Sequence, residues 1–319
     1  MAISNLPARL RTRICFGLVF VLIKSELLLL TDSQAVKGAG ASFGVVTKFV
    51  VKTHPEPGSV VQFTYTVSFG KQADMAPTFN AWQTLVSDPD LDRRFASEFI
   101  MEPLGCVITG TFYGSRAEFN ATGLQSRFPK GGRFSFTIND WLASVTQEAT
   151  NEALYISNTP IPFYSKSLAF TQKDVIPASN VTDTFKWIDG ASKGTLLWFI
   201  IFDVEGGAIN DVPQNATAYP HRDKFMFYQS YAIGLPLSQT TKNFLTDFHN
   251  RIVSTLPAES GNAESYAGYV DPGLGANAQQ DYWGPNLPRL EQIKKRWDPS
   301  DVFHNPQSVR PAAVSTVVP

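Results

Sequence analysis

Residues 60–69 read VVQFTYTVSF, and hydrophobic side chains alternate along this run. One face of it carries Phe63, Tyr65, Val67 and Phe69, the pattern of a β-strand with one buried face. Similar runs predict strands at 96–101, 106–113, 134–138, 165–171, 195–204 and 224–232. Hydrophobic residues at helical spacing predict helices at 73–87, 179–190 and 239–256. Strands and helices do not alternate strictly, so the sequence predicts an α+β fold, with a mainly antiparallel sheet covered by helices on one face.

The composition of the 319 residues excludes several classes of protein. Lys and Arg total 27 and Asp and Glu 28, a net charge of −1, so the chain lacks the basic surface typical of nucleic-acid binding. Hydrophobic residues make up 43%, too many for a disordered chain. Two cysteines, Cys15 and Cys106, are too few for a disulfide scaffold, and the four histidines lack metal-ligand spacing. We therefore predict no metal site.

The N-terminal segment has features of a secretory signal. Arginines precede a hydrophobic run from Cys15 to Ile23, and residues 33–35 have the small-x-small pattern of a cleavage site. The run is too short to span a bilayer, so we predict no stable membrane span. Two charged residues, Lys24 and Glu26, interrupt the pattern, which leaves open an N-terminal segment without a targeting role.

Three acceptor triplets for N-linked glycans occur in the chain, starting at Asn120, Asn180 and Asn215. Such triplets are also common by chance. Together with the low charge content of 17% and the scarcity of cysteine, they favour a secreted glycoprotein.

Residues 38–44, GAGASFG, allow three interpretations. A dinucleotide-binding G-x-G-x-x-G motif needs glycine where Phe43 stands and a helix afterwards, so it is rejected. A hydrolase G-x-S-x-G motif makes Ser42 a nucleophile, with His304 as a base, but the strand predicted after Gly44 argues against it. The third interpretation is a glycine-rich turn that brings bare backbone close to a flat cofactor, and an ordinary turn is its structural alternative.

Four polar residues lie in otherwise hydrophobic surroundings. Asp203 ends the predicted strand at 195–204, and Gln229 lies among the aromatic residues of the strand at 224–232. Tyr266 and Tyr269 are three residues apart in a turn-rich segment. A buried carboxylate or phenol needs a hydrogen-bonding partner, so these residues are candidates for a site. Packing of the rings and exposure of the polar groups is the alternative.

Two ordered stretches of the chain resemble one family. Residues 38–47, GAGASFGVVT, resemble a glycine-rich segment of FAD-linked oxidases of the berberine bridge enzyme and oligosaccharide oxidase type. Residues 266–272 (YAGYVDP), residues 282–290 (YWGPNLPRL) and the run 293–307 resemble the berberine-like C-terminal segment of that family. The resemblance extends over residues 38–309.

The resemblance implies a flavoprotein in which a FAD-binding module, formed by the two ends of the chain, brackets a substrate domain. It divides the chain into a divergent segment at 1–37, a remnant of the FAD-binding domain at 38–55, a substrate domain at 56–257 and a berberine-like segment at 258–319. It also implies oxidation of an alcohol or sugar by hydride transfer to FAD, with O₂ as the acceptor.

The resemblance assigns roles to particular residues. Tyr269 and Asp203 match the catalytic pair, in which the carboxylate makes the phenol oxygen more basic. Gln229 and Tyr266 match substrate-binding positions. The positions that match cofactor contacts are Gly40, Ser42, Gly44, Val45, Val46 and Gly268.

Two departures from the family pattern remain. The family has asparagine where this chain has Gly268, so a contact to the flavin is expected to be lost. Residues 1–37 do not resemble the family's N-terminal FAD-binding half, so the chain looks like the C-terminal part of such an oxidase, and the sequence leaves open whether it is active alone. Two alternatives stay open: a secreted binding protein that has lost the redox chemistry, and a serine hydrolase that uses Ser42.

Overall fold

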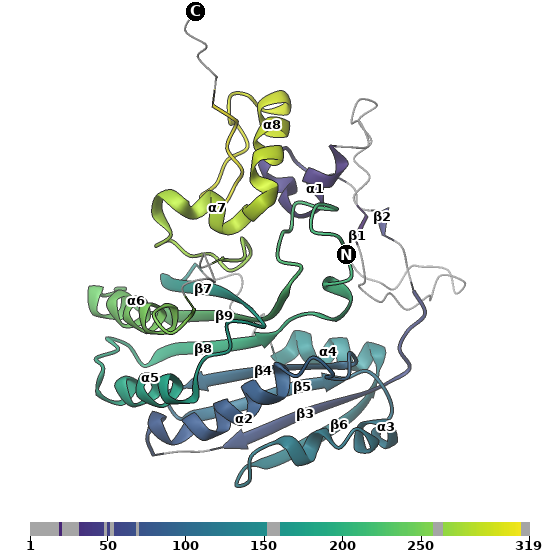
Figure 1. Cartoon of the computed structure of the whole chain (residues 1–319), viewed down its shortest axis with the longest axis vertical. Helices are drawn as coiled ribbons and strands as arrows, with labels where there is room; N and C mark the ends of the chain where they lie inside the picture. The colour runs from purple at the N-terminus through teal and green to yellow at the C-terminus, as the bar shows by residue number, and fades with distance from the viewer. Residues whose placement is uncertain are drawn as a thin grey trace, which may run out of the picture.

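The computed structural model describes residues 19–20, 32–47, 50–51, 54–67, 70–151, 160–257 and 264–313. Its centre is an antiparallel sheet of seven strands in the order β6-β3-β5-β4-β8-β9-β7 (Figure 1). The strands are β3 (Ser59–Val67), β4 (Phe95–Glu102), β5 (Gly105–Phe112), β6 (Arg133–Asp140), β7 (Phe163–Thr171), β8 (Leu197–Val204) and β9 (Lys224–Ile233). The predicted α+β class and the antiparallel sheet are confirmed.

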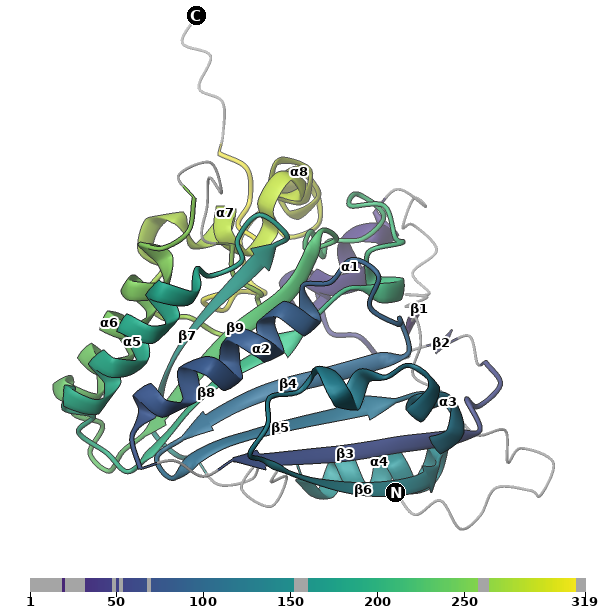
Figure 2. The same ribbon diagram turned by 60° about the horizontal axis from the view of Figure 1, so that its bottom comes forward.

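Three helices cover one face of this sheet, as Figure 2 shows. They are α2 (Ala76–Val86), α5 (Ala178–Gly190) and α6 (Gln239–Val253). Their hydrophobic sides pack on the rings of the strands: the centroid of Phe79 lies 5.1 Å from that of Phe99 and 4.6 Å from that of Phe202. The short helix α3 (Arg116–Ala121) begins with a capping box of Ser115 and Glu118.

Helix α4 (Trp141–Asn151) was not predicted from the sequence, and it lies on the other face of the sheet, beside β3 and β6 (Figure 2). Its buried side includes a polar residue, Ser144, whose carbonyl accepts from Gln62 Nε2 of β3, whereas Leu142 is exposed. The second face is therefore partly covered as well, which corrects the expectation of helices on one face.

A second hydrophobic cluster joins the N-terminal and C-terminal parts of the described chain. It combines Ala35 and Ala39 of α1 (Ser33–Ala39) with residues of α7 (Ala278–Trp283) and α8 (Leu287–Trp297). Figure 1 shows α1 beside α8, at one end of the sheet. The loop before β9 also belongs to the cluster, because Ala218 is buried in it and donates its N–H to the carbonyl of Lys37 at 2.9 Å.

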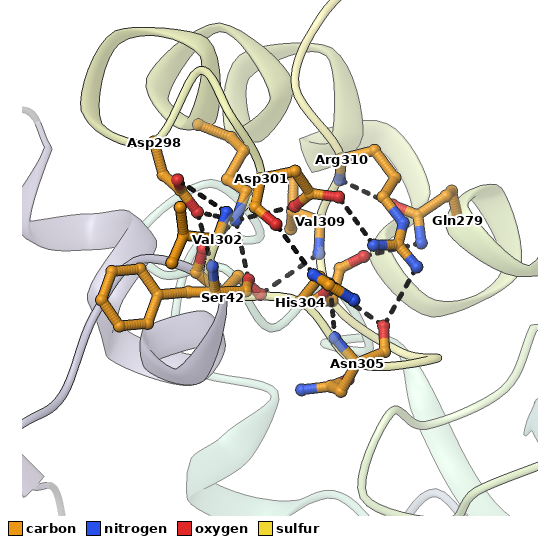
Figure 3. A network of polar contacts seen from close by, with 12 residues as sticks. Ser42, Gln279, Asp298, Asp301, Val302, His304, Asn305, Val309 and Arg310 are labelled. Atoms are coloured by element: carbon orange, nitrogen blue, oxygen red, sulfur yellow. Dashed lines mark hydrogen bonds and ion pairs between the residues drawn. The ribbon is translucent and has the colours of Figure 1, made fainter.

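A fully buried lysine connects the same two parts of the chain. Lys294 Nζ donates to the carbonyl of Ser42 at 2.6 Å, to Asp298 Oδ2 at 2.6 Å and to the carbonyl of Phe303 at 2.7 Å. It also forms an ion pair with Asp301 at 3.0 Å. Figure 3 shows the surrounding network, in which the N–H of Val309 donates to Ser42 Oγ. The segment around Ser42 is thus fixed by residues some 250 positions further along the chain.

The residue before α8 connects this helix to a distant loop. Asn286 occupies the N-cap position, but its side chain makes no capping hydrogen bond. Its Nδ2 donates instead to the carbonyl of Gln214 at 2.9 Å and to that of Thr217 at 3.2 Å. The side chain therefore ties the loop before β9 to the C-terminal helices.

The glycine-rich segment is only partly as predicted. Gly38 has a φ of 111°, which suits glycine, and a 3-10 turn, η3 (Gly40–Ser42), follows it. Of the strand predicted after Gly44, the structure describes β2 (Val50–Val51), while residues 45–47 have no regular structure. Residues 48, 49, 52 and 53 lie outside the described residues.

The hydrophobic run of the predicted signal segment lies outside the described residues, except for β1 (Val19–Phe20), which pairs with β2. The predicted cleavage site at residues 33–35 lies in α1, where Ala35 is buried. Within the ranges that the structure describes, no helix is long and hydrophobic enough to cross a membrane.

Candidate active site

Asp203 and Tyr269 meet at the end of β8. Phe202 and Val204 pack on the core, so strand alternation directs Asp203 to the opposite face. Tyr269 lies in a turn in which its N–H donates to the carbonyl of Tyr266 at 2.8 Å. Its phenol forms a hydrogen bond with the carboxylate of Asp203. Burial raises the pKa of the Tyr269 phenol, and the charge of Asp203 raises it further, so the phenol is neutral at physiological pH.

Gln229 and Tyr231 extend this contact along β9. Gln229 Nε2 donates to Asp203 Oδ2 at 2.8 Å, and the phenol of Tyr231 donates to Gln229 Oε1 at 2.8 Å. The two residues are two positions apart on one strand, so they share a face of the sheet. Burial and the nearby Asp203 raise the pKa of Tyr231. The result is a hydrogen-bonded chain, Tyr231–Gln229–Asp203–Tyr269, which we call the polar chain.

Tyr266 belongs to a cluster of rings beside the polar chain. Its ring centroid lies 5.3 Å from that of Tyr269, 5.6 Å from that of Tyr219 and 5.9 Å from that of Phe227. A Cβ atom at Gly268 would lie 2.5 Å from Cε1 of Tyr266. The ring of Tyr266 therefore occupies the space that a side chain at position 268 needs. The glycine that departs from the family pattern allows this position of Tyr266.

Glu205 is a further ionisable group that sequence reasoning missed. It follows Asp203 by two positions and is the first residue after β8. Burial raises the pKa of its carboxyl to about 7. Its charge in turn raises the pKa values of Tyr219, Tyr266 and Tyr269, which places it beside the ring cluster. The sequence signal was its i, i+2 spacing from Asp203, directly before two glycines.

His221 is a second group that the sequence did not indicate. Its Nδ1 lies 3.0 Å from Glu264 Oε2, and Lys224 Nζ approaches the same oxygen at 3.0 Å. Its Nε2 is buried and has no hydrogen-bonding partner among the described residues. The ring lies against Tyr219, with a centroid distance of 5.2 Å. No spacing pattern in the sequence identifies this residue, because its partners come from distant segments.

A large cavity adjoins the polar chain on the side of the sheet opposite α2, α5 and α6. Its volume is about 1350 Å³. Its floor consists of residues that alternate with core residues, such as Thr64 and Thr109, and α4 forms a wall through Trp141. The cavity reaches Gln229 and Tyr231, the two β9 members of the polar chain. A hydroxyl-rich floor with an aromatic wall suits a ligand with many hydroxyl groups.

The predicted cofactor-binding residues around η3 lie near the ring cluster. A Cβ atom at Gly38 would lie 3.1 Å from the backbone nitrogen of Tyr219, the ring neighbour of Tyr266. Gly40 packs against Val46, with 3.5 Å between its Cβ position and Val46 Cγ2. A Cβ at Gly44 would meet no atom within 4 Å, and Val45 is 80% exposed. The segment thus has an open side.

Ser42 is held as a structural residue. It is 2% exposed, and its Oγ accepts from the N–H of Val309 at 3.1 Å. The histidine considered as its base, His304, is exposed and contacts the carbonyl of Asp301 through Nδ1 (Figure 3). The described residues therefore supply no nucleophile–base pair at Ser42, and the helix that a nucleophile elbow requires does not follow it.

No group of three or more His, Cys, Asp or Glu side chains within the described ranges could hold a metal ion. The roles predicted for Tyr269, Asp203, Gln229, Tyr266, Gly268 and the residues around η3 stay predictions. The structure places the first five of these residues in one group, in which each lies against at least one other member. The segment that leads into η3 lies against Tyr219, which contacts this group through the ring of Tyr266.

Residues 265–310 match the family model described as "Berberine and berberine like". Among curated proteins, the chain is 35% identical over 283 residues to FAD-linked oxidoreductase sorD of Penicillium rubens, an alignment that covers 87% of this chain and 59% of that protein. It is 28% identical to the carbohydrate oxidase of Microdochium nivale, over 86% of this chain and 58% of the relative. The chain thus spans a little under 60% of the length of these relatives.

Solved structures give the same result. The carbohydrate oxidase of Microdochium nivale in complex with a substrate analogue superposes with a TM-score of 0.73 at 27% identity, over 89% of this chain and 62% of that one. The xylooligosaccharide oxidase of Myceliophthora thermophila in complex with xylobiose superposes with a TM-score of 0.76 at 25% identity, over the same shares. The chain is therefore similar in sequence and in fold to FAD-linked oxidases of the berberine bridge enzyme and oligosaccharide oxidase type, and residues 265–310 form a berberine-like segment.

Proposed function

We propose that this chain acts in the FAD-dependent oxidation of an alcohol or sugar-type substrate, by transfer of a hydride to the flavin, with O₂ as the final acceptor. The observation that carries the proposal is the polar chain, which ends in Tyr269 and lies between the cavity and the η3 segment. The names of the relatives, FAD-linked oxidoreductase and carbohydrate oxidase, support it.

Tyr269 is the proposed acceptor of the hydroxyl proton of the substrate. A phenol whose pKa is raised is a poor base while it stays neutral, but it can take a proton as it passes its own proton to Asp203. The substrate proton then resides on the Tyr269 oxygen and the former phenol proton on the carboxylate. Gln229 holds Asp203 Oδ2 in place for this transfer. When bound, the flavin supplies the acceptor for the hydride that leaves the substrate carbon.

The cavity supports a polar, multi-hydroxyl substrate. Strands in a sheet are about 4.8 Å apart, and the cavity lining extends from β6 to β7 across all seven strands of the sheet, so it spans roughly 29 Å. Tyr113 and Trp141, with ring centroids 6.2 Å apart, border it at α4. Phe163 and Tyr231 border it near the polar chain, 6.0 Å apart. A substrate longer than one sugar ring fits this length.

The residues near η3 fit the flat ring system of a flavin on two observations. The buried Nε2 of His221 lacks a partner among the described residues, which is costly unless a ligand supplies one. The open backbone at Gly44 and the exposed Val45 provide a surface that a ring can cover. The residues that would hold the ring are Gly44, Val45 and His221, with the cluster around Tyr266 at its side.

Flavin content is the decisive test of this proposal. The purified chain is expected to show flavin absorbance, to release FAD on denaturation, and to form hydrogen peroxide with alcohol or sugar substrates. Tyr269→Phe is expected to retain the flavin and lose turnover by a factor on the order of a thousand, because the proton acceptor is gone. Tyr164→Phe, which removes a half-buried phenol bonded to Thr246, is the matched control and keeps turnover.

A colourless protein that binds no added FAD contradicts the oxidase proposal. It supports the second candidate, a binding protein that keeps the cavity without redox chemistry. If the chain is such a binding protein, its cavity and aromatic borders favour ligands with many hydroxyl groups. Calorimetric titration with sugars then distinguishes a folded binding protein from an unfolded or inactive product.

We further propose that the chain is a secreted glycoprotein. The acceptors Asn120 and Asn215 are exposed and Asn180 is partly exposed, so all three are open to modification. Expression in a eukaryotic host is expected to give a product whose mass falls after endoglycosidase treatment. An unchanged mass argues against this proposal.

A further inference from the structure

Three consecutive residues of β7 hold three consecutive residues of the turn that carries Tyr269. Ser167 Oγ donates to the carbonyl of Tyr269 at 2.7 Å, and Ser165 Oγ donates to the carbonyl of Val270. Lys166 Nζ donates to Asp271 Oδ1 at 2.8 Å. Side chains of the edge strand therefore hold the turn at residues 269–271.

The two serines point to the same face as the polar chain. In the ladder between β7 and β9, Ser167 lies directly opposite Gln229, and Ser165 lies opposite Tyr231. Tyr269 is consequently held at both ends: its carbonyl by Ser167 on β7, and its phenol by Asp203 on β8. Gln229, on the strand between, bonds to Asp203 and faces Ser167 across the ladder.

The hydroxyl of Ser167 is itself oriented. It has one proton, which goes to the carbonyl of Tyr269, so in its contact with Ser265 Oγ the hydroxyl of Ser265 is the donor. Both hydroxyls are buried, with Ser167 1% and Ser265 0% exposed. Hydrogen bonds in a series strengthen one another, so the series Ser265–Ser167–Tyr269 holds the carbonyl of Tyr269 in one orientation.

The ion pair locks the turn on the other side of β7. Lys166 and Asp271 are 5% and 3% exposed, and the N–H of Gly273 donates to the same carboxylate at 2.8 Å. The phenol of Tyr282 accepts from the N–H of Asp271 at 3.0 Å. The turn is therefore bonded to side chains on both faces of β7, and these bonds oppose a shift of the turn along the strand.

We propose that Ser167, assisted by Ser165, is a positioning residue that sets the orientation of the Tyr269 phenol against Asp203. This inference rests on the proposed function for its catalytic meaning, but the geometry it describes exists without a flavin. Loss of the Ser167 hydroxyl frees the carbonyl next to the Cα atom of Tyr269, and loss of the Ser165 hydroxyl frees the carbonyl of the following residue, Val270. The phenol then moves away from the carboxylate.

The test is the NMR signal of the Tyr269 ring in protein labelled with ¹³C at the tyrosine ζ carbon, without flavin. Tyr269→Phe assigns the signal, and Asp203→Asn shows its position when the carboxylate charge is absent. Ser167→Ala, alone and with Ser165→Ala, is expected to move the signal in the direction of the Asp203→Asn position, with the larger change in the double variant. A signal unchanged in both folded serine variants overturns the inference.

Ser230→Ala is the matched control. Ser230 is a fully buried serine on β9 whose hydroxyl lies 2.7 Å from the phenol of Tyr228, so its loss has a similar cost to stability. It is expected to leave the Tyr269 signal in place. Equal changes in this control and in Ser167→Ala show a general loosening of the fold and overturn the positioning role.

In flavin-loaded protein, Ser167→Ala is expected to lower kcat by roughly a hundredfold with KM changed less than about twofold, as expected for a misplaced reacting group. Absence of flavin in the wild type contradicts the proposed function alone, since the ¹³C experiment still decides on the orientation of Tyr269. An unchanged kcat in loaded Ser167→Ala contradicts the positioning role alone.

Discussion

Replacing Lys294 by methionine is expected to loosen the whole unit formed by α1, η3, α7 and α8. Methionine has a similar length and keeps the hydrophobic contacts, so the change removes chiefly the charge and its three hydrogen bonds. Two carboxylates and two carbonyls of distant segments then lose their common partner. No side chain nearby can replace it, because Lys294 is fully buried.

The structure allows an estimate of the cost. Removing one partner of a buried ion pair destabilises a protein by about 3–5 kcal/mol. The lower end applies here, because Asp298 keeps hydrogen bonds from the N–H groups of Val302 and Phe303 at 2.9 Å. Asp301 likewise keeps its ion pair with Arg310 at 2.8 Å. We therefore expect a loss of about 3 kcal/mol in the opening free energy of this unit.

Hydrogen exchange followed by mass spectrometry measures this opening locally. Amides in 287–313 that exchange by opening of the unit are expected to exchange on the order of a hundredfold faster, which corresponds to about 3 kcal/mol. Amides of β4 and β8 are expected to change little. Lys295→Met is the control, since among the described residues the Lys295 side chain donates to the exposed carbonyl of Ala313 at 3.4 Å and to no other group. If Lys294→Met and Lys295→Met exchange alike, the reasoning is refuted.

Three further predictions concern single groups. Burial alone raises the pKa of Asp298, but hydrogen bonds from Lys294 and from two backbone N–H groups outweigh it and lower this pKa to about 2. The unit formed by α1, η3, α7 and α8 should therefore keep its stability above pH ~4 and lose it as the pH falls toward 2. Unfolding measured as a function of pH tests this, and Asp298→Asn should flatten the dependence. Gly268→Ala places a Cβ 2.5 Å from the Tyr266 ring, so stability should drop by about 1–3 kcal/mol and the near-ultraviolet circular dichroism should change; an unaltered spectrum speaks against the contact. Burial raises the pKa of Glu205 to about 7, so the folded state favours the neutral carboxyl and stability should decrease as the pH rises from about 4.5 through 7. Glu205→Gln should remove that decrease. If stability falls with pH as steeply in Glu205→Gln as in the wild type, the burial of this carboxyl is contradicted.

The sheet was predictable from sequence because its strands carry their own signal. In β3 the alternation places Phe63 and Tyr65 in the core, and that pattern alone fixes which face is buried. The same holds for α6, where Phe244 and Phe248 recur at helical spacing. Helix α4 carried no such stripe, because its buried face is partly polar and borders the cavity.

The site was predictable only in part. Asp203 stood out as a carboxylate at the end of a hydrophobic strand, and the resemblance selected Tyr269. The contact between the two is a product of tertiary structure, since it joins residues 66 positions apart through a turn that β7 holds in place. His221 gave no distinct pattern, and the spacing of Glu205 from Asp203 did not reveal that its carboxyl is buried, because that burial depends on the tertiary structure.

The turn that carries Tyr269 has a second effect, on the behaviour of the molecule at high concentration. β7 is the last strand of the sheet, and an uncovered edge strand offers its backbone groups to strands of other molecules. Here the N–H of Ala169 is satisfied by the carbonyl of Glu264 at 2.8 Å, and the serine hydroxyls hold the segment beyond it against the strand. The segment that carries Tyr269 thereby also covers part of the edge strand and opposes edge-to-edge aggregation. Variants that release this segment should therefore have two defects, a displaced Tyr269 and an exposed edge strand.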